Sequence, residues 1–400
     1  MSTKRSHIGI IFLTIFIDMV GFGIVIPILP RYAEHFGATT MQIGFLVGIF
    51  SMAQFIFASI WGKVSDRIGR KPLLVISTLG TAVGFYIMGA APTLVFLFIG
   101  RLVDGISGAN IGTAQAYIAD ITSPAERSKS MGLIGAAFGL GFIFGPAMGG
   151  WVASHYGMGA PMYVASVMAL MNAVLILSIL PESLPKEKRG ARYNENIFPG
   201  LFQHIDKGAY FSVVLTYFCV IAGFSIMTTT FALFLWYRFN LDEKHTGFLF
   251  ALIGMIGVII QGGLIGRLVK RFGEARLVTV GSLILGLSFL WLPFTATMGA
   301  MIIACCFVAV GNSLLMPTLS GIASRSVDSA WQGRALGVMQ SGGSLARWIG
   351  PVLAGWLLVF DLHRDHFFYA RTALWVGGIF LALAFAISFA LPKSQSVRTT

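Results

Sequence analysis

Apolar residues are gathered into twelve long runs, separated by polar segments, along this chain of 400 residues. A helix that crosses a bilayer needs about 20 mostly apolar residues, and each run has roughly that length. The runs lie near residues 8–30, 42–62, 73–91, 94–120, 130–154, 161–180, 211–235, 245–266, 277–294, 299–323, 334–358 and 368–391. The pattern predicts an all-α membrane protein with twelve transmembrane helices.

One polar segment, residues 181–210, is much longer than the others and separates six runs from six. We therefore expect an N-terminal six-helix bundle over 1–180 and a C-terminal six-helix bundle over 211–400, joined by a cytoplasmic linker. Five apolar linker residues share one face at helical spacing: Ile197, Phe198, Leu201, Phe202 and Ile205. This spacing is typical of a short helix in the membrane interface, and a flexible linker is an equal alternative.

The two halves carry related sequences at corresponding places. Residues 62–69 recur in altered form as residues 266–273, at an offset of 204, and residues 145–151 recur as 350–356, at an offset of 205. Two independent matches at nearly one offset indicate a duplicated chain. In a membrane protein, parallel repeats of this kind place a substrate site between them, near the bilayer midplane.

Composition and charge agree with a membrane protein. The chain is 56% hydrophobic and 11% charged, against about 25% charged in soluble domains. With the start of the chain in the cytoplasm, 21 of the 28 Lys and Arg residues fall on the cytoplasmic side. The positive-inside rule then predicts a multi-pass inner-membrane protein with both termini cytoplasmic. The net charge of +12 is thus a sign of topology, and we expect no nucleic-acid partner.

The fifth run has regularly spaced glycines. They belong to the set Gly132, Gly141, Gly145, Pro146, Gly149 and Gly150. A spacing of four keeps Gly141, Gly145 and Gly149 on one helical face, which forms a smooth groove for a partner helix. Pro146 removes a backbone hydrogen bond and permits a bend. The pattern G-x8-G-x3-G-P-x2-G-G resembles the antiporter signature of the major facilitator superfamily.

A second resemblance lies in the first cytoplasmic turn, which looks like the superfamily's G-x3-D-R-x-G-R-K loop. Its residues here are Gly62, Asp66, Arg67, Gly69, Arg70 and Lys71. The two glycines suit a tight turn, and the cations hold it in the cytoplasm. The resemblance implies that Asp66 meets the start of the eleventh helix and that Arg70 bridges Asp66 to Asp120. These groups would form a latch that holds the outward-facing state.

The first run, from Asp18 to Pro30, resembles the D-x2-G-x-G-x3-P-x-L-P segment of twelve-helix drug:proton antiporters, including tetracycline exporters. The resemblance spans the chain. It implies two pseudo-symmetric six-helix bundles around a central cavity, alternating access, and a monomer that exchanges a small molecule for protons.

Four charged residues fall within the predicted spans. Asp18 and Asp104 each lie about 15 Å along a helix, with Arg101 one turn from Asp104, and Arg347 lies at mid-depth in the eleventh helix. A charge at the bilayer centre costs at least about 2.5–3.5 kcal/mol. One interpretation is purely structural, with salt bridges Asp18–Arg101 and Asp104–Arg347. The other is proton coupling, in which Asp18 is the first candidate carrier, Asp104 the second, and Arg101 resembles the superfamily's arginine that tunes proton transfer.

Candidate substrate-binding residues are polar, aromatic or Met side chains within the spans. They are Arg347, Asn110, Gln115, Tyr117, Phe224, Met227, Phe231, Met316 and Gln340. The second half lacks the acids expected for metal–tetracycline binding, which argues against tetracycline itself. Arg347 could instead favour an anionic or sugar-like substrate.

These features predict a secondary transporter that exports small amphipathic compounds in exchange for protons. An alternative is a transporter of a sugar, lipid precursor or anionic metabolite anchored by Arg347. A non-transporting receptor or scaffold is the alternative from another class. An enzyme is not expected, because the spans hold no nucleophile–base set and no metal cluster. The sequence has no P-loop, so we expect an ion gradient as the energy source and no cofactor.

Overall fold

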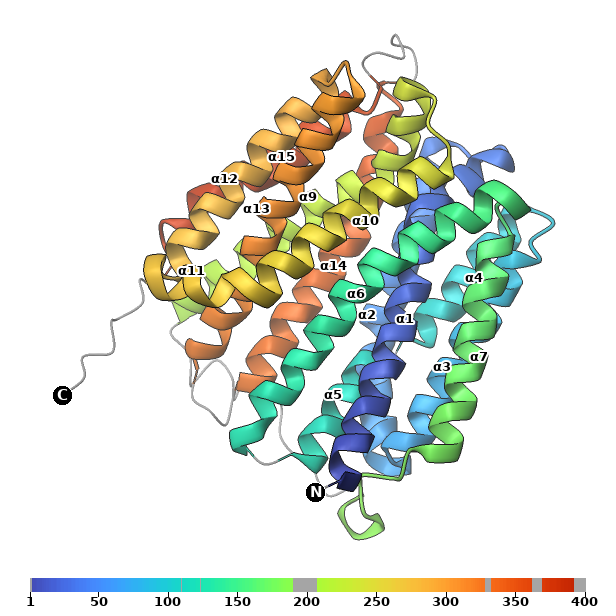
Figure 1. Cartoon of the computed structure of the whole chain (residues 1–400), viewed down its shortest axis with the longest axis vertical. Helices are drawn as coiled ribbons and strands as arrows, with labels where there is room; N and C mark the ends of the chain where they lie inside the picture. The colour runs from blue at the N-terminus through green and yellow to red at the C-terminus, as the bar shows by residue number, and fades with distance from the viewer. Residues whose placement is uncertain are drawn as a thin grey trace. The chain divides into compact units, whose positions relative to one another are not determined.

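The computed structural model describes residues 2–108, 110–122, 124–189, 207–327, 332–361 and 369–391 (Figure 1). Every regular element in these ranges is a helix. The chain divides into two compact units, Met1–Asn194 with Asn240–Gly254, and Glu195–Phe239 with Met255–Thr400. The predicted helix at 197–205 lies outside the described residues.

The first half of the chain contains α1 (Ser2–His35), α2 (Thr40–Ile68), α3 (Arg70–Gly89), α4 (Leu94–Ile106), α5 (Asn110–Ile121), α6 (Pro124–Tyr156), α7 (Ala160–Ile179) and the short η1 (Lys186–Lys188). The second half contains α9 (Lys207–Phe239), α10 (Glu243–Ile259), the π-helical η2 (Ile260–Leu264), α11 (Ile265–Phe272), α12 (Glu274–Trp291), η3 (Leu292–Phe294), α13 (Met298–Arg325), α14 (Gln332–Leu358) and α15 (Arg371–Ser388).

The helical membrane fold is confirmed. Within the described residues, eleven helical stretches are long and apolar enough to cross a membrane. The twelfth predicted span, 334–358, falls in α14, which has 27 residues but is not among the eleven. It holds Gln340, several serines and glycines, and Arg347, and these residues lower its mean hydropathy.

The span predicted near 94–120 corresponds to Leu94–Ile121, and its helix is interrupted between α4 and α5. The backbone carbonyls at the interruption accept hydrogen bonds from side chains of neighbouring helices. Trp61 Nε1 donates to Ile106 O, Ser77 Oγ to Ser107 O, and Gln54 Nε2 to Gly108 O. Non-helical backbone is tolerated at membrane depth when its polar groups are satisfied in this way.

The turns that follow α2 and α11 are alike. Gly69, between α2 and α3, has φ of 108°, and Gly273, between α11 and α12, has φ of 76°. Only glycine adopts this backbone readily. The predicted turn role of Gly62 is wrong, however, because Gly62 lies inside α2, and a Cβ there would meet nothing within 4 Å.

Candidate functional site

Glycines of α6 bring this helix into close contact with α1, beside it in Figure 1. A Cβ on Gly145 would lie 2.6 Å from Val20 O and 2.8 Å from the Cα of Gly23, and one on Gly149 would lie 3.0 Å from the Cα of Ile24. The groove predicted from the glycine spacing is therefore filled by α1. These contacts are made by the residues that follow Asp18 on α1.

A second face of α6 packs against α10, which the sequence reasoning did not foresee. A Cβ on Gly254 would lie 2.8 Å from Phe142 O, and side chains on Gly247 and Gly150 would overlap the backbone of Pro146 and Glu243, respectively. At the same end of α10, Arg31 Nη1 lies 3.0 Å from Glu243 Oε1, with both side chains nearly buried. The ion pair therefore ties the end of α1 to the start of α10 within the first unit.

Asp18 of α1 lies near the two charged residues of α4, which form a buried ion pair. Arg101 Nη1 lies 3.2 Å from Asp104 Oδ2, and both residues are under 5% exposed. The Arg101 guanidinium also stacks over the Phe50 ring, 4.5 Å from its centroid. Gly84 of α3 lets α4 approach, since a Cβ there would lie 2.9 Å from that of Asp104.

Asp18 is next to this pair without being paired itself. Its carboxylate interacts with the Asn110 side chain and electrostatically with Asp104, and Asn110 Oδ1 accepts from Thr78 Oγ1 at 3.4 Å. The buried Oδ1 of Asp18 has no hydrogen-bond partner among the described residues. The ion pair Asp18–Arg101, which we considered, is absent from these residues, and Arg101 pairs with Asp104 instead. The ion pair Asp104–Arg347 stays a prediction.

The predicted latch residues meet at the start of α3. Arg70 Nη2 lies 2.6 Å from Asp66 Oδ1, Arg70 Nε lies 3.1 Å from Asp120 Oδ2, and Nη1 donates to Ser65 Oγ at 2.8 Å. Arg70 is 3% exposed, so the guanidinium is held on all sides. Arg67 is exposed on α2. The contact of Asp66 with the eleventh helix stays a prediction.

Glu182 completes this network, and the sequence reasoning missed it. Its Oε1 accepts from the backbone N–H of Arg70 at 2.9 Å, and Oε2 accepts from that of Lys71 at 3.3 Å. Carboxylates are stabilising at helix N-termini because the first N–H groups lack helical partners. Nearby, Ser183 Oγ donates to Asp120 Oδ2 at 3.2 Å. The available signal was an acid directly after α7, in the sequence Pro181-Glu182-Ser183.

The second unit has a corresponding ion pair with the charges exchanged. Glu274, the first residue of α12, contacts Arg325, the last residue of α13. Glu274 occupies the place of Arg70 at the repeat offset of 204, and Arg325 occupies that of Asp120 at 205. The duplicated halves therefore both have an ion pair at this position, but the acidic and the basic residue have exchanged places.

The predicted substrate-binding residues differ in accessibility. Tyr117, Met227 and Phe231 have no exposed surface, and the Tyr117 hydroxyl donates to Pro181 O at 2.9 Å. These three side chains therefore cannot touch a substrate in this conformation. Surface remains on Gln115, Phe224, Met316, Gln340 and Arg347, while Asn110 is buried beside Asp18.

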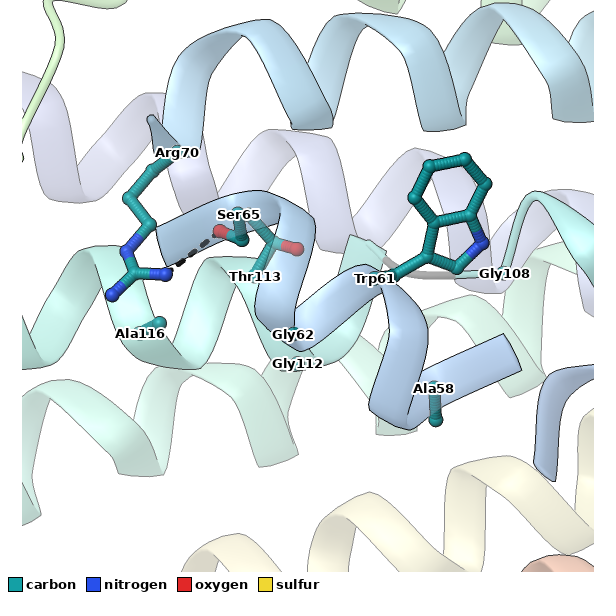
Figure 2. Close-up of a pocket in the computed structure, with 9 residues that line it drawn as sticks. All are labelled: Ala58, Trp61, Gly62, Ser65, Arg70, Gly108, Gly112, Thr113 and Ala116. Carbon is teal, nitrogen blue, oxygen red and sulfur yellow. Dashed lines mark hydrogen bonds between the residues drawn. The ribbon is translucent and has the colours of Figure 1, made fainter. Parts of the chain in front are cut away.

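A small cavity lies where α2 faces α5 (Figure 2), with a volume of about 180 Å³. Its lining consists mainly of small residues, with Trp61 and Arg70 as the large ones. Figure 2 shows the hydrogen bond from Arg70 to Ser65 at one end. Pockets that bind drug-sized ligands have volumes of about 300–1,000 Å³, so this cavity is too small to be the substrate site.

Comparisons with known proteins agree with the motifs. The profile of the Major Facilitator Superfamily matches residues 11–347 and, separately, 213–400. The chain is 32% identical over 383 residues to Multidrug resistance protein 2 of Bacillus subtilis (strain 168), covering 94% of each. It is 31% identical to the class C Tetracycline resistance protein of Escherichia coli, covering 85% of this chain and 86% of the relative.

Solved structures share the fold. The human organic anion transporter MFSD10 (TETRAN) superposes with a TM-score of 0.73 at 25% identity, covering 96% of this chain and 99% of that chain. An inward-facing bacterial homologue of the human lysosomal transporter Spinster superposes at 0.79 with 15% identity, covering 97% and 96%. The apolar helices, the glycine packing of α6, the Arg70 network and these matches together establish that the chain is a multi-pass membrane protein that belongs to the major facilitator superfamily.

Proposed function

We propose that this chain is a proton-coupled exporter of small amphipathic compounds, placed in an inner membrane with both termini in the cytoplasm. Relatives at about 30% identity over most of the chain are multidrug and tetracycline resistance proteins. Their names support efflux of amphipathic compounds. The second half lacks the acids expected for metal–tetracycline binding, which argues against tetracycline itself.

The observation that carries proton coupling is the Asp18 cluster. Asp104 has Arg101 as its counter-charge, whereas no described residue forms an ion pair with Asp18. A charged carboxylate inside a membrane protein is costly when one oxygen has no partner. Protonation of the carboxylate removes that cost because it removes the charge, and contact with water removes it because water solvates the charge. Asp18 therefore suits a group that loads a proton on one side of the membrane and releases it on the other.

Arg101 and Asn110 have distinct roles in this proposal. Arg101 keeps Asp104 compensated, so that a change of protonation falls on Asp18 first. Asn110 can donate to the charged carboxylate and accept from the protonated one, because a primary amide offers both groups. Proton binding drives export only if it favours one conformation of the transporter over the other. In this proposal, the Arg70 network is the latch that such a bias opens or closes.

The test is proton movement in inverted membrane vesicles energised to an acid-inside gradient. A chemically varied panel of compounds is added to wild type, Asp18→Asn and the control Asp242→Asn, which neutralises an exposed acid outside the spans. We expect at least one compound to collapse the gradient in wild type and in the control, and none to do so in Asp18→Asn. If folded Asp18→Asn moves protons as wild type does, Asp18 is not the carrier. If no compound moves protons in wild type, the antiport proposal fails.

A further inference from the structure

A polar cluster on α9 and α14 lies in the second unit, apart from the residues proposed for proton coupling. Tyr217 of α9 donates its hydroxyl to Gln340 Oε1 over 3.1 Å. On α14, Arg347 Nη2 donates to Ser344 Oγ at 2.9 Å. Gln340, Ser344 and Arg347 are spaced by four and three residues, so they share one helical face.

Gly343 makes room for this cluster. A Cβ at position 343 would lie 2.6 Å from the Tyr217 ring, closer than real side chains approach, and 3.4 Å from Arg347 Nη1. The missing side chain lets the phenol ring and the guanidinium lie against the same stretch of α14. The packing of Tyr217 and Arg347 against α14 therefore depends on the glycine at position 343.

Among the described residues of the second unit, no Asp or Glu forms an ion pair with Arg347. The helices α9, α13, α14 and α15 contain no Asp or Glu, and neither do residues 255–272. Glu274, at the start of α12, is already paired with Arg325. Among the described residues, the hydroxyl of Ser344 is the one side chain that accepts a hydrogen bond from Arg347. A cation within a transmembrane segment is costly unless a partner or water compensates it.

The free hydrogen-bonding groups of the cluster are donors. Gln340 uses its carbonyl oxygen to accept from Tyr217, which leaves its two amide N–H groups. Arg347 has N–H groups beyond the one that Ser344 accepts. Gln340 and Arg347 keep exposed surface, whereas Tyr217 is 4% exposed and serves as a support. A planar, donor-rich, positively charged surface matches a carboxylate or sulfonate, which a guanidinium can bind through two oxygens.

We propose that Arg347, assisted by Gln340, binds the anionic group of an amphipathic substrate, a carboxylate or a sulfonate. The inference rests on the proposed function and narrows its substrate class. Arg347 repels lipophilic cations, so the exporter prefers anions of the same size and shape.

Binding is measured by calorimetry on the purified full chain in lipid nanodiscs, with two probes that share a ring system. These are naphthalene-1-sulfonate and (1-naphthyl)trimethylammonium. The variants are Arg347→Gln, Arg347→Lys and the control Arg276→Gln, which removes the same charge from an exposed position on α12. A hydrogen bond to a charged group corresponds to at least about a tenfold change in affinity. We expect that loss for the sulfonate in Arg347→Gln, with partial recovery in Arg347→Lys and no change in the control.

Three results would overturn the anion site: equal sulfonate affinity in wild type and Arg347→Gln, a wild-type preference for the cation, or binding of neither probe. If Arg347→Gln does not fold, the measurement is made on Gln340→Leu in its place. A sulfonate affinity equal to that of wild type in Gln340→Leu would likewise overturn the proposed site. Asp18→Asn separates this inference from the proposed function, because it should bind sulfonate like wild type. Sulfonate binding that depends on Arg347 but never moves protons would refute antiport and leave the anion site standing.

Discussion

Replacement of Gly145 by alanine tests whether the glycine face of α6 sets the distance to α1. The added Cβ would lie 2.6 Å from Val20 O and 2.8 Å from the Cα of Gly23, where ordinary contact begins at 3.4 Å. Both obstacles are backbone atoms, so no side chain can turn aside, and α1 would have to move by most of an ångström. Overpacking of this kind typically costs about 1–3 kcal/mol.

Gly135→Ala is the matched control, because it makes the same change on the same helix. A Cβ at position 135 would meet nothing within 4 Å. There the intrinsic preference of helices for alanine dominates, which favours the variant by about 0.5–1 kcal/mol. The two substitutions should therefore shift stability in opposite directions.

The assay is thermal unfolding of both variants in detergent, followed by fluorescence-detected size-exclusion chromatography, together with efflux from cells. We expect a lower Tm and impaired efflux for Gly145→Ala, and an equal or higher Tm with normal efflux for Gly135→Ala. If Gly145→Ala matches Gly135→Ala in both measurements, the close contact of α6 with α1 is not required, and the argument from glycine spacing is refuted.

Two further predictions concern the ends of helices. Glu182→Ala leaves the first N–H groups of α3 without their acceptor and should cost about 1–2 kcal/mol of stability, measured as a lower Tm. The control Glu187→Ala, at an exposed position, should have the Tm of wild type. Equal Tm values for the two variants would show that Glu182 is not a cap. Arg31→Gln and Glu243→Gln each remove one charge of a nearly buried ion pair, so each should lower the Tm. The double variant should lose less than the two losses combined, and additive losses would show that the pair is not coupled.

The helices could be predicted from the sequence because each apolar run has the length that a bilayer requires. The interruption at Gly108 could not, since it depends on Trp61, Ser77 and Gln54 lying close enough to supply donors. At Gly62 the sequence predicts a turn that the structure does not have. A glycine near a turn resembles a turn residue, and only its place inside α2 shows otherwise.

The candidate site was predictable where its partners are close in sequence. Arg101 and Asp104 are three residues apart on one helix, so their ion pair follows from helical geometry. Gly145 indicated a partner helix but could not identify α1. The contact of Gly150 with α10 and the cap that Glu182 provides involve residues about 90 and 110 positions apart, and no local pattern encodes such distances.

The π-helical segment Ile260–Leu264 also records how the two halves diverged. Gly44-Phe45-Leu46 recurs as Gly247-Phe248-Leu249 at an offset of 203, whereas Gly62 recurs as Gly266 at 204. In agreement, α2 has 29 residues and the stretch Glu243–Phe272 has 30. A π turn accommodates one residue more than an α turn. A single residue inserted between Gly247 and Gly266 would therefore form the π turn and leave both ends of the helix in place. Related chains that lack the inserted residue should align with this chain with a gap of one residue within Ile260–Leu264.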